Sequence, residues 1–515
     1  DAEEGGRVGR KMDLDADMPW GRFLSCGAYK QVFRVFHAEA KREEAVSVMD
    51  VDSIKEIGSA VVVAQELLVS LLVSTLVHRG DCPNFVSTLG LFSAAYPPSP
   101  SMWGSETDRC PRGADPPKNM ASLHRRPNRR QQKGKPGCYQ YIRMELCGEG
   151  DMEEYTMDKV LPEESIRPLA FQMVYSLYVA QVEFHMRHYD VKLLNFLLKS
   201  INDKAEDSEE ETQASSLANI SYGVAGAVYR MQSHLWVKLA DFGTADVNAD
   251  SLGSLVGLDH FTTLENSPIE YLFLGSGAQQ DYSADTWQLG LSMLHMFTGH
   301  KPYEELMEEV VCPAALRRRL MKTWEAGYSR RKSVDSHIWR QRFEVIRDVM
   351  SDGDASREES ELDPTLADTL YRFLVLLGVP SLKARDGDVE DGGSHPAPPA
   401  YVSESPVWET VTAVLGPRQR RFTHEEKDIQ RTFDLDRSRW SLDHGDRPIM
   451  EGARLRMDKL GGLSLVKSML CFESDTRPTL LEVLGSSFFV SLREPQQHES
   501  QTNSPTNSHK FLKYL

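Results

Sequence analysis

Two short stretches of the sequence are the most informative, and they read His188-Tyr-Asp-Val-Lys-Leu-Leu-Asn195 and Val237-Lys-Leu-Ala-Asp-Phe-Gly243. In the first stretch Asp190 stands five residues before Asn195, and in the second Asp241 follows an apolar strand-like run. A carboxylate can orient a hydroxyl nucleophile and accept its proton, while carboxylate and amide oxygens are suitable ligands for Mg²⁺ on phosphates. The two stretches together indicate a phosphoryl-transfer site.

These stretches resemble the HRDxKxxN catalytic loop and the DFG metal loop of the protein kinase superfamily. Further segments match motifs of that family in the same order, between about Trp20 and Val490. They are the glycine-rich loop at 25–32, the αC glutamate Glu66, the hinge at 144–148, the APE segment at 267–270, the buried motif at 285–290 and the late arginine Arg477. The resemblance therefore covers most of the chain.

The sequence departs from the family pattern at the lysine that binds phosphate. The third strand should end in this lysine but ends in Met49, which can neither carry charge nor donate a hydrogen bond. In the glycine-rich loop, Ser25 and Lys30 occupy the first and third glycine positions. The with-no-lysine kinases carry their lysine at this third position, so the resemblance implies that Lys30 reaches the phosphates and Glu66. The alternative is that Lys30 is an exposed strand residue.

The catalytic loop contains a second departure. Tyr189 replaces the arginine that usually binds a phosphate on the activation loop, which argues against control by phosphorylation of that loop. Lys192, two residues after Asp190, is associated in the family with Ser/Thr specificity. Thr263, seven residues before Glu270, matches the threonine that supports the catalytic aspartate.

The composition excludes several other classes of protein. The 515 residues are 40% hydrophobic, so a core can form, and the net charge of −17 argues against a generic nucleic-acid binder. Seven cysteines without a CxxC pair argue against disulfides or zinc and favour a reducing compartment, the cytoplasm or alternatively the nucleus. The apolar stretch 60–77 contains Glu66, so we expect a buried helix of a soluble protein and no membrane span.

The predicted fold is α+β and bilobal, as in protein kinases. We expect a flexible segment at 1–19, a small antiparallel β-rich lobe with one helix at 20–147, a larger helical lobe at 148–493 and a tail at 494–515. Segments 93–137, 202–216 and 381–406 are predicted to be mobile insertions because of their polar composition. The basic part of the first, at 109–135, reads as a solvated loop or as a docking site for an acidic partner.

The resemblance implies an ATP-dependent protein serine/threonine kinase that uses Mg²⁺ and acts on a protein substrate. Asp190 and Lys192 would be catalytic, Asn195 and Asp241 would bind metal, and ATP would be bound by Ser25, Gly27, Lys30, Val32, Glu66, Glu145 and Cys147. The structural and substrate-segment residues would be Thr263, Glu270, Asp285 and Arg477. The main alternative is a weak or inactive pseudokinase that acts as a binding module, which the altered glycine loop and Met49 favour. A small-molecule kinase is a further alternative, which the peptide-docking segment at 263–270 opposes.

Overall fold

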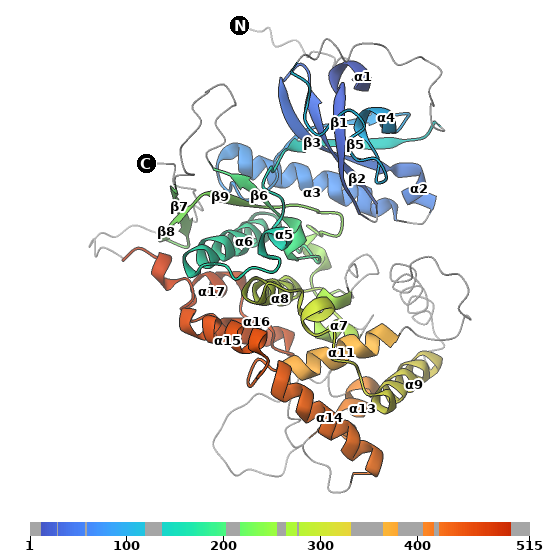
Figure 1. The fold of residues 1–515 in the computed structure, drawn as a ribbon, viewed down its shortest axis with the longest axis vertical. Coiled ribbons are helices and arrows are strands. Elements are labelled where there is room, and N and C mark those ends of the chain that lie inside the picture. Colours follow the sequence, from blue (N-terminus) through green and yellow to red (C-terminus); the bar gives the residue numbers. More distant parts are fainter. Residues whose placement is uncertain are drawn as a thin grey trace. The chain divides into compact units, whose positions relative to one another are not determined.

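The structure is a computed structural model that describes residues 12–27, 29–56, 59–118, 136–201, 217–254, 264–274, 278–330, 364–379, 405–416 and 422–495. The chain divides into two compact units (Figure 1). Unit 1 comprises Asp1–Gly150, Leu197–Ser200 and Ala240–Gly243, and unit 2 comprises Asp151–Phe196, Ile201–Leu239 and Thr244–Leu515. Because the first unit is rich in strands and the second is mainly helical, the predicted α+β class is confirmed.

Unit 1 is built on a five-stranded antiparallel sheet with the strand order β1-β2-β3-β5-β4. Its strands are β1 (Trp20–Cys26), β2 (Gln31–His37), β3 (Arg42–Asp50), β4 (Thr88–Ala94) and β5 (Tyr139–Glu145). Its helices are α1 (Leu14–Asp17), α2 (Val51–Glu56), α3 (Ala60–Arg79) and α4 (Pro100–Trp103). Alternation along the strands sends successive side chains to opposite faces of the sheet.

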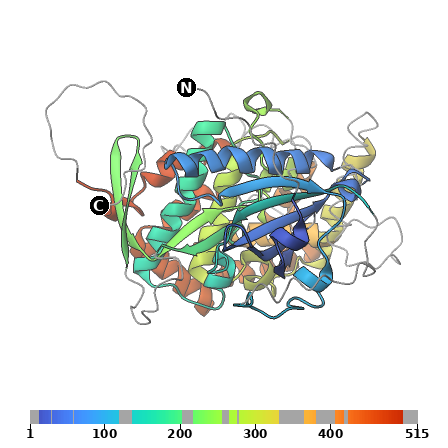
Figure 2. The ribbon, with the colours of Figure 1, turned by 90° about the horizontal axis from the view of Figure 1, so that it is seen from above.

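Each face of this sheet is covered by an apolar cluster. On one face, Phe33, Val48 and Tyr141 pack with Trp103 of α4. On the other face, Met49 packs against residues of α2 and α3, and Figure 2 shows α3 lying along the sheet. Both faces of the sheet therefore carry packed apolar side chains, and the packing on the second face holds α3 against the sheet.

Helix α3 is apolar nearly all round. Within the described parts of the chain it is the one helix that is long and apolar enough to cross a membrane, judged by length and composition alone. Its inner face packs on the sheet through Val63, as a core helix does, and it carries Glu66. The sequence predicted a buried helix here, but the opposite side is exposed, with Val61, Leu68 and Leu71 between 46% and 53% exposed.

The predicted mobile insertion at 93–137 is wrong for its first part. Residues 100–103 form α4, and Trp103 is 1% exposed. The Trp103 indole N–H donates a hydrogen bond of 3.1 Å to the carbonyl of Met18, and its ring lies 5.5 Å from that of Phe33. A single large aromatic side chain buries enough apolar surface to order a segment whose average composition is polar. Residues 119–135, the segment 202–216 and residues 381–404 of the predicted insertion 381–406 lie outside the described residues. The last residue of that insertion, Pro406, begins a helix that spans Pro406–Leu415.

The strands of unit 2 are β7 (Ala218–Val224), β8 (Ala227–Ser233) and β9 (Leu235–Leu239). Strand β6 (Phe196–Ser200) belongs to unit 1 except for its first residue. The helices of unit 2 are α5 (Met152–Thr156), α6 (Glu163–Phe184), α7 (Ile269–Leu274), α8 (Ser283–Thr298), α9 (Ala314–Arg330), α11 (Pro364–Leu377), α13 (Pro406–Leu415), α14 (His424–Trp440), α15 (Pro448–Leu460), α16 (Leu463–Met469) and α17 (Leu480–Leu484). Every residue of α8 is buried, as its apolar sequence predicts, and α6 carries two glutamates in its first turn, where they favour the helix dipole.

Strands β7 and β8 form a hairpin that the sequence did not reveal. Ala225 and Gly226 both have positive φ, as a two-residue hairpin turn of type I′ requires. Tyr222 and Tyr229 face each other across the hairpin and pack on Phe171 of α6, with ring distances of 5.3 and 4.9 Å. The hairpin is visible in Figure 2 and extends the core of unit 2 around α6.

Candidate active site

In unit 1, the ammonium group of Lys30 lies between two carboxylates. Its Nζ is 2.9 Å from Oε1 of Glu66 on α3 and 2.8 Å from Oδ1 of Asp241. The side chain of Lys30 is 17% exposed and that of Glu66 is 5% exposed, so water screens this contact little. Burial opposes the charge of Lys30, but the carboxylates of Asp241 and Glu66 outweigh it and raise the lysine pKa above its ordinary value. Lys30 is therefore a cation at neutral pH.

The strand register explains how Lys30 serves the face that Met49 occupies. Gln31 on β2 stands opposite Val48 on β3, so the preceding residue, Lys30, comes opposite Met49. Cross-strand neighbours in an antiparallel pair point to the same face of the sheet. Met49 is 1% exposed and packs toward α3, and Lys30 extends over that same face to Glu66. The ammonium group of Lys30 therefore lies on the face of the sheet to which a lysine at position 49 would point.

The turn that contains Asp241 packs closely against α3. A Cβ atom at Gly243 would lie 3.2 Å from Cγ1 of Val62 and 3.4 Å from Oε2 of Glu66, so a side chain there would crowd both residues. Asp241 itself has a φ of +63°, in the left-handed region that costs a non-glycine residue free energy. The glycine and the strained aspartate together keep the Asp241 carboxylate within reach of Lys30.

The glycine-rich loop joins β1 to β2 in a tight turn. Ser25 and Val32 are cross-strand partners at its base, and the N–H of Gly27 donates to the carbonyl of Lys30 at 2.8 Å. A Cβ atom at Gly27 would meet no atom within 4 Å, so this glycine is not demanded by packing inside unit 1.

The predicted hinge follows β5 in the same unit. The carboxylate of Glu145 accepts a hydrogen bond from the N–H of Ser87 at 2.9 Å and pairs with Lys199 at 2.8 Å. Cys147 follows two residues later and is half-buried. These contacts fix the backbone at the end of β5, where the family resemblance places the adenine.

In unit 2, the catalytic-loop side chains converge on the carboxylate of Asp190, which is 6% exposed. The Nζ of Lys192 is 3.0 Å from Oδ2 of Asp190. The amide of Asn195 donates to the same oxygen at 3.1 Å and to the Asp190 carbonyl at 2.8 Å. The carboxylate is thereby held in one orientation, which a group that positions a hydroxyl requires.

Helix α8 holds the backbone of this loop from below. The buried carboxylate of Asp285 accepts hydrogen bonds from the N–H groups of His188, at 2.8 Å, and Tyr189, at 2.9 Å. Burial raises the pKa of Asp285, although the interactions with His188 and Tyr189 act in the opposite direction. One turn further along α8, Gln288 donates to the carbonyl of Tyr189 and accepts from the N–H of Val191, both at 2.8 Å. These bonds stabilise the positive φ of +62° at Tyr189.

A buried ion pair ties two distant parts of unit 2 together. The guanidinium of Arg477 donates to both carboxylate oxygens of Glu270, with 2.8 Å from Nη1 to Oε1. The two side chains are 0% and 7% exposed, and the guanidinium lies 4.8 Å over the ring of Trp287. This is the contact that the late arginine and the APE glutamate of the family resemblance imply.

Comparison with known proteins agrees with this geometry. The family described as the protein kinase domain matches residues 135–489, which is more than half of the chain. The chain belongs to the protein kinase family. No curated protein matches this kinase. The matched residues include the catalytic loop, Asp241 and Arg477, but they begin after β4, so Lys30, Met49 and Glu66 lie before them.

Three side chains that hold the catalytic loop of this kinase were missed in the sequence. Gln288 was detectable as a polar residue in an apolar buried helix, since such a residue needs partners. Thr244, whose hydroxyl donates to the carbonyl of His188 at 2.9 Å, and Arg187 gave no pattern of their own. Thr263, which the sequence did predict, lies outside the described residues.

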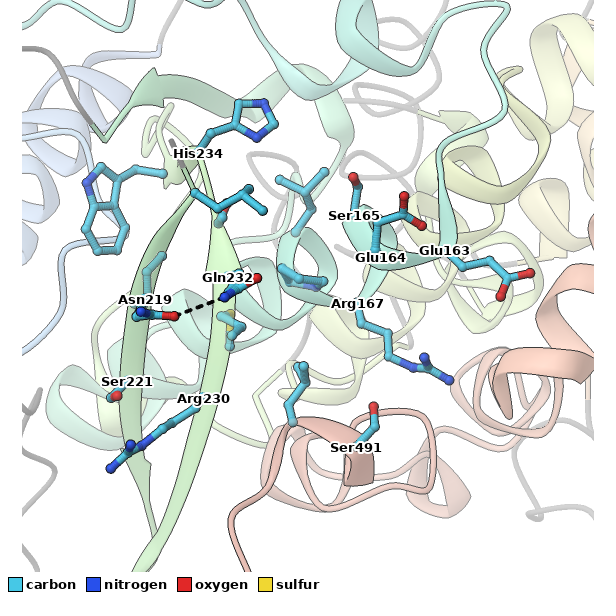
Figure 3. Close-up of a pocket in the computed structure, with 18 of the residues that line it drawn as sticks. Glu163, Glu164, Ser165, Arg167, Asn219, Ser221, Arg230, Gln232, His234 and Ser491 are labelled. Atoms are coloured by element: carbon cyan, nitrogen blue, oxygen red, sulfur yellow. Dashed lines mark hydrogen bonds between the residues drawn. The ribbon is translucent and has the colours of Figure 1, made fainter. Parts of the chain in front are cut away.

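A cavity of about 800 Å³ in unit 2 lies between the β7–β8 hairpin and the first turns of α6 (Figure 3). Glu164 and Arg167 of α6 line it, with Asn219 and Gln232 of the hairpin and Ser491 near the end of the described chain. None of the predicted site residues of the kinase is among its lining residues. The cavity is therefore not part of the candidate active site.

Proposed function

We propose that this kinase is active and transfers the γ-phosphoryl group of ATP to a serine or threonine hydroxyl of a protein substrate. The observation that carries the proposal is the position of the Lys30 ammonium between Glu66 and Asp241. Met49 alone would favour an inactive protein, because methionine cannot bind a phosphate. Lys30 places a cation on the same face of the sheet, which supports catalysis in spite of Met49.

Each of the candidate site residues then has a role in the reaction. Lys30 binds the α- and β-phosphates, and Glu66 orients its ammonium. Asp190 orients the substrate hydroxyl and accepts its proton while the oxygen bonds to the γ-phosphorus and the bond to the ADP oxygen breaks. Lys192, 3.0 Å from Asp190, screens the charge of the transferring phosphoryl group. The adenine packs against Val32 and meets the hinge backbone at Glu145 and Cys147.

The residues present suit a magnesium ion that arrives with the nucleotide. In the described residues no three His, Cys, Asp or Glu side chains gather into a metal site of their own. Mg²⁺ in kinases is held by one or two protein groups together with phosphate oxygens, and the Asp241 side chain is 42% exposed and offers such a group. We assign Asp241 and Asn195 as its protein ligands. The bound ion would neutralise the charge of the phosphate oxygens.

Specificity for serine and threonine rests on Lys192, which the family associates with such enzymes. The competing function is a pseudokinase that binds partners without turnover. Ser25 at a glycine position and Met49 in β3 favour it, whereas the joint presence of Asp190, Asn195 and Asp241 favours catalysis.

The test is transfer of labelled γ-phosphate from ATP to the kinase itself and to a generic protein substrate, with Asp190→Asn as the inactive control. We expect Mg²⁺-dependent labelling that is recovered as phosphoserine or phosphothreonine. Thermal unfolding with and without nucleotide is measured in parallel. If ATP raises the melting temperature but labelling never exceeds that of Asp190→Asn, the protein is a pseudokinase and the proposal fails.

A further inference from the structure

Arg187 is a buried cation beside the catalytic loop that no motif assigns. It directly precedes the His-Tyr-Asp sequence at 188–190, and it is 0% exposed. Its backbone exchanges two hydrogen bonds of 2.9 Å with that of Asp246, five residues after Asp241. Arginine is almost never fully buried unless it is paired, so the contacts of this side chain define its role.

The guanidinium of Arg187 joins two segments of unit 2. Nη2 lies 2.7 Å from Oδ2 of Asp246, donates to the carbonyl of Asn248 at 2.9 Å and contacts the hydroxyl of Ser251. On its other side, Nε donates to the phenol oxygen of Tyr189 at 3.2 Å. Three positions of the segment that follows the Asp-Phe-Gly turn are thus tied to the catalytic loop by one side chain.

Asp246 provides the negative charge that this arrangement needs. Its side chain is 15% exposed. Burial opposes its charge, but the hydroxyl of Ser251, the N–H of Asn248 and the guanidinium of Arg187 hold the pKa of Asp246 below its usual range. Asp246 is therefore ionised at neutral pH, and the ion pair with Arg187 exists without any modification of the chain.

The same contacts explain how Tyr189 fits where the family pattern has arginine. The phenol is 1% exposed, donates to Oε1 of Gln280 at 3.0 Å and accepts from Arg187. A second guanidinium at position 189 would be buried next to that of Arg187, at a large cost in free energy. In the family pattern the arginine of the catalytic loop meets a phosphate on the activation segment. Here the guanidinium comes from position 187, and its anion, Asp246, is encoded in the segment.

We propose that Arg187 is a positioning residue that holds segment 244–254 in its working conformation without phosphorylation. The carboxylate of Asp246 takes the place of the phosphate as the anion that orders the segment. This inference rests on the proposed kinase function, since it concerns the regulation of the same site. It predicts that the enzyme is active as synthesised and that removal of phosphate leaves it active.

The first test is hydrogen exchange of the backbone amides at 244–254, which does not depend on activity. Asp246→Asn keeps the shape of the side chain and removes its charge, and Arg187→Met removes the guanidinium. Arg230→Met is the matched control, because Arg230 is 60% exposed and pairs with Glu494 elsewhere in unit 2. We expect exchange at 244–254 to accelerate by about tenfold or more in the first two variants and not in the control. Unchanged exchange in Asp246→Asn overturns the proposal, even if Arg187→Met fails to fold.

The second test compares kinetics before and after phosphatase treatment. For Asp246→Asn we expect kcat to fall by about tenfold or more while KM for ATP stays within about twofold, because the residue acts on the loop and not on the nucleotide. Arg187→Lys, which keeps the charge without the fork, should retain an intermediate kcat. A loss of about tenfold in wild-type activity on phosphatase treatment would refute the proposal. If the wild type transfers no phosphate at all, the proposed function fails, and the exchange experiment alone decides whether Arg187 orders the segment.

Discussion

Replacing Lys30 with methionine should lower both the stability and the activity of the kinase, and the two effects can be separated. The Glu66 side chain is 5% exposed, so the substitution leaves a nearly buried carboxylate without its ammonium partner. Breaking a buried pair in this way costs about 3–5 kcal/mol. The contact with Asp241 adds little, because the Asp241 side chain is 42% exposed and solvent screens it. We expect the free energy of unfolding to fall by about 3 kcal/mol.

Activity and stability should respond differently when a second substitution is added to Lys30→Met. Loss of one preorganised cation at the phosphates should reduce kcat/KM by about 10²–10³, or about 3–4 kcal/mol. In the double variant Lys30→Met with Glu66→Met, the buried charge is gone and an apolar pair replaces it, which is often neutral for stability. This protein should recover most of the lost stability and none of the activity. Lys30→Met with Met49→Lys should instead recover part of the activity, because position 49 serves the same face of the sheet.

The assay is steady-state phosphoryl transfer together with chemical denaturation of each purified variant. Lys55→Met, on an exposed position of α2, controls for the loss of a lysine in the same unit. Wild-type kcat/KM in Lys30→Met would show that Lys30 does not bind the phosphates. If Lys30→Met and its double variant with Glu66→Met lose equal stability, the unpaired Glu66 carboxylate is not the cause of the lower free energy of unfolding.

Three further substitutions test other parts of the site. Asp241→Asn should abolish Mg²⁺-dependent transfer and leave the melting temperature nearly unchanged, and retained transfer would exclude Asp241 as a metal ligand. Arg477→Met should lower the free energy of unfolding by about 3–5 kcal/mol in denaturant titrations, because it leaves Glu270 buried without its partner, and a loss below about 1 kcal/mol would contradict this. Burial lowers the pKa of His295 from 6.5 to about 4. Between these pH values His295 is protonated in the unfolded chain but neutral in the folded chain. The free energy of unfolding therefore falls by up to about 3 kcal/mol as pH falls from 6.5 to 4. His295→Gln should flatten this part of the stability profile, and identical slopes would disprove the assignment.

Much of the fold could be read from the sequence, because the deciding signals are local. Apolar residues recur with helical spacing over 163–186, where the structure has α6 (Glu163–Phe184), and residues 285–297 are apolar nearly all round, where it has α8 (Ser283–Thr298). The contact between Lys30 and Glu66 could also be anticipated, since a glutamate in an apolar helix needs a cation and the neighbouring strand had gained one. The approach of Asp241 to the same ammonium was not foreseen.

The features that the sequence did not reveal depend on contacts between distant residues. Trp103 orders part of a segment whose composition is polar, because one indole ring outweighs many small polar residues in buried area. Tyr222 and Tyr229 of the hairpin pack on Phe171 of α6, which lies about 50 residues earlier in the chain. Arg187 looks like an ordinary charged residue until Asp246 is found beside it, 59 positions further along the chain. Composition and periodicity are evaluated over short stretches of neighbouring residues, whereas these contacts join residues that are far apart in the sequence.

At both departures from the family pattern, a cation from a neighbouring position of the chain takes the place of the usual one. At each place a cation is missing from its usual position, and a nearby backbone position supplies it: Lys30 comes opposite Met49 in the β2–β3 register, and Arg187 lies two residues before Tyr189. In each case the cation lies next to a carboxylate that is largely shielded from water, Glu66 in one case and Asp246 in the other. A buried carboxylate without a cation would cost several kcal/mol, so the carboxylate is the more reliable sign of where the cation must be. In this chain the absence of the lysine from the third strand is therefore not by itself a sign of an inactive kinase, because the carboxylate of Glu66 has the ammonium of Lys30 beside it.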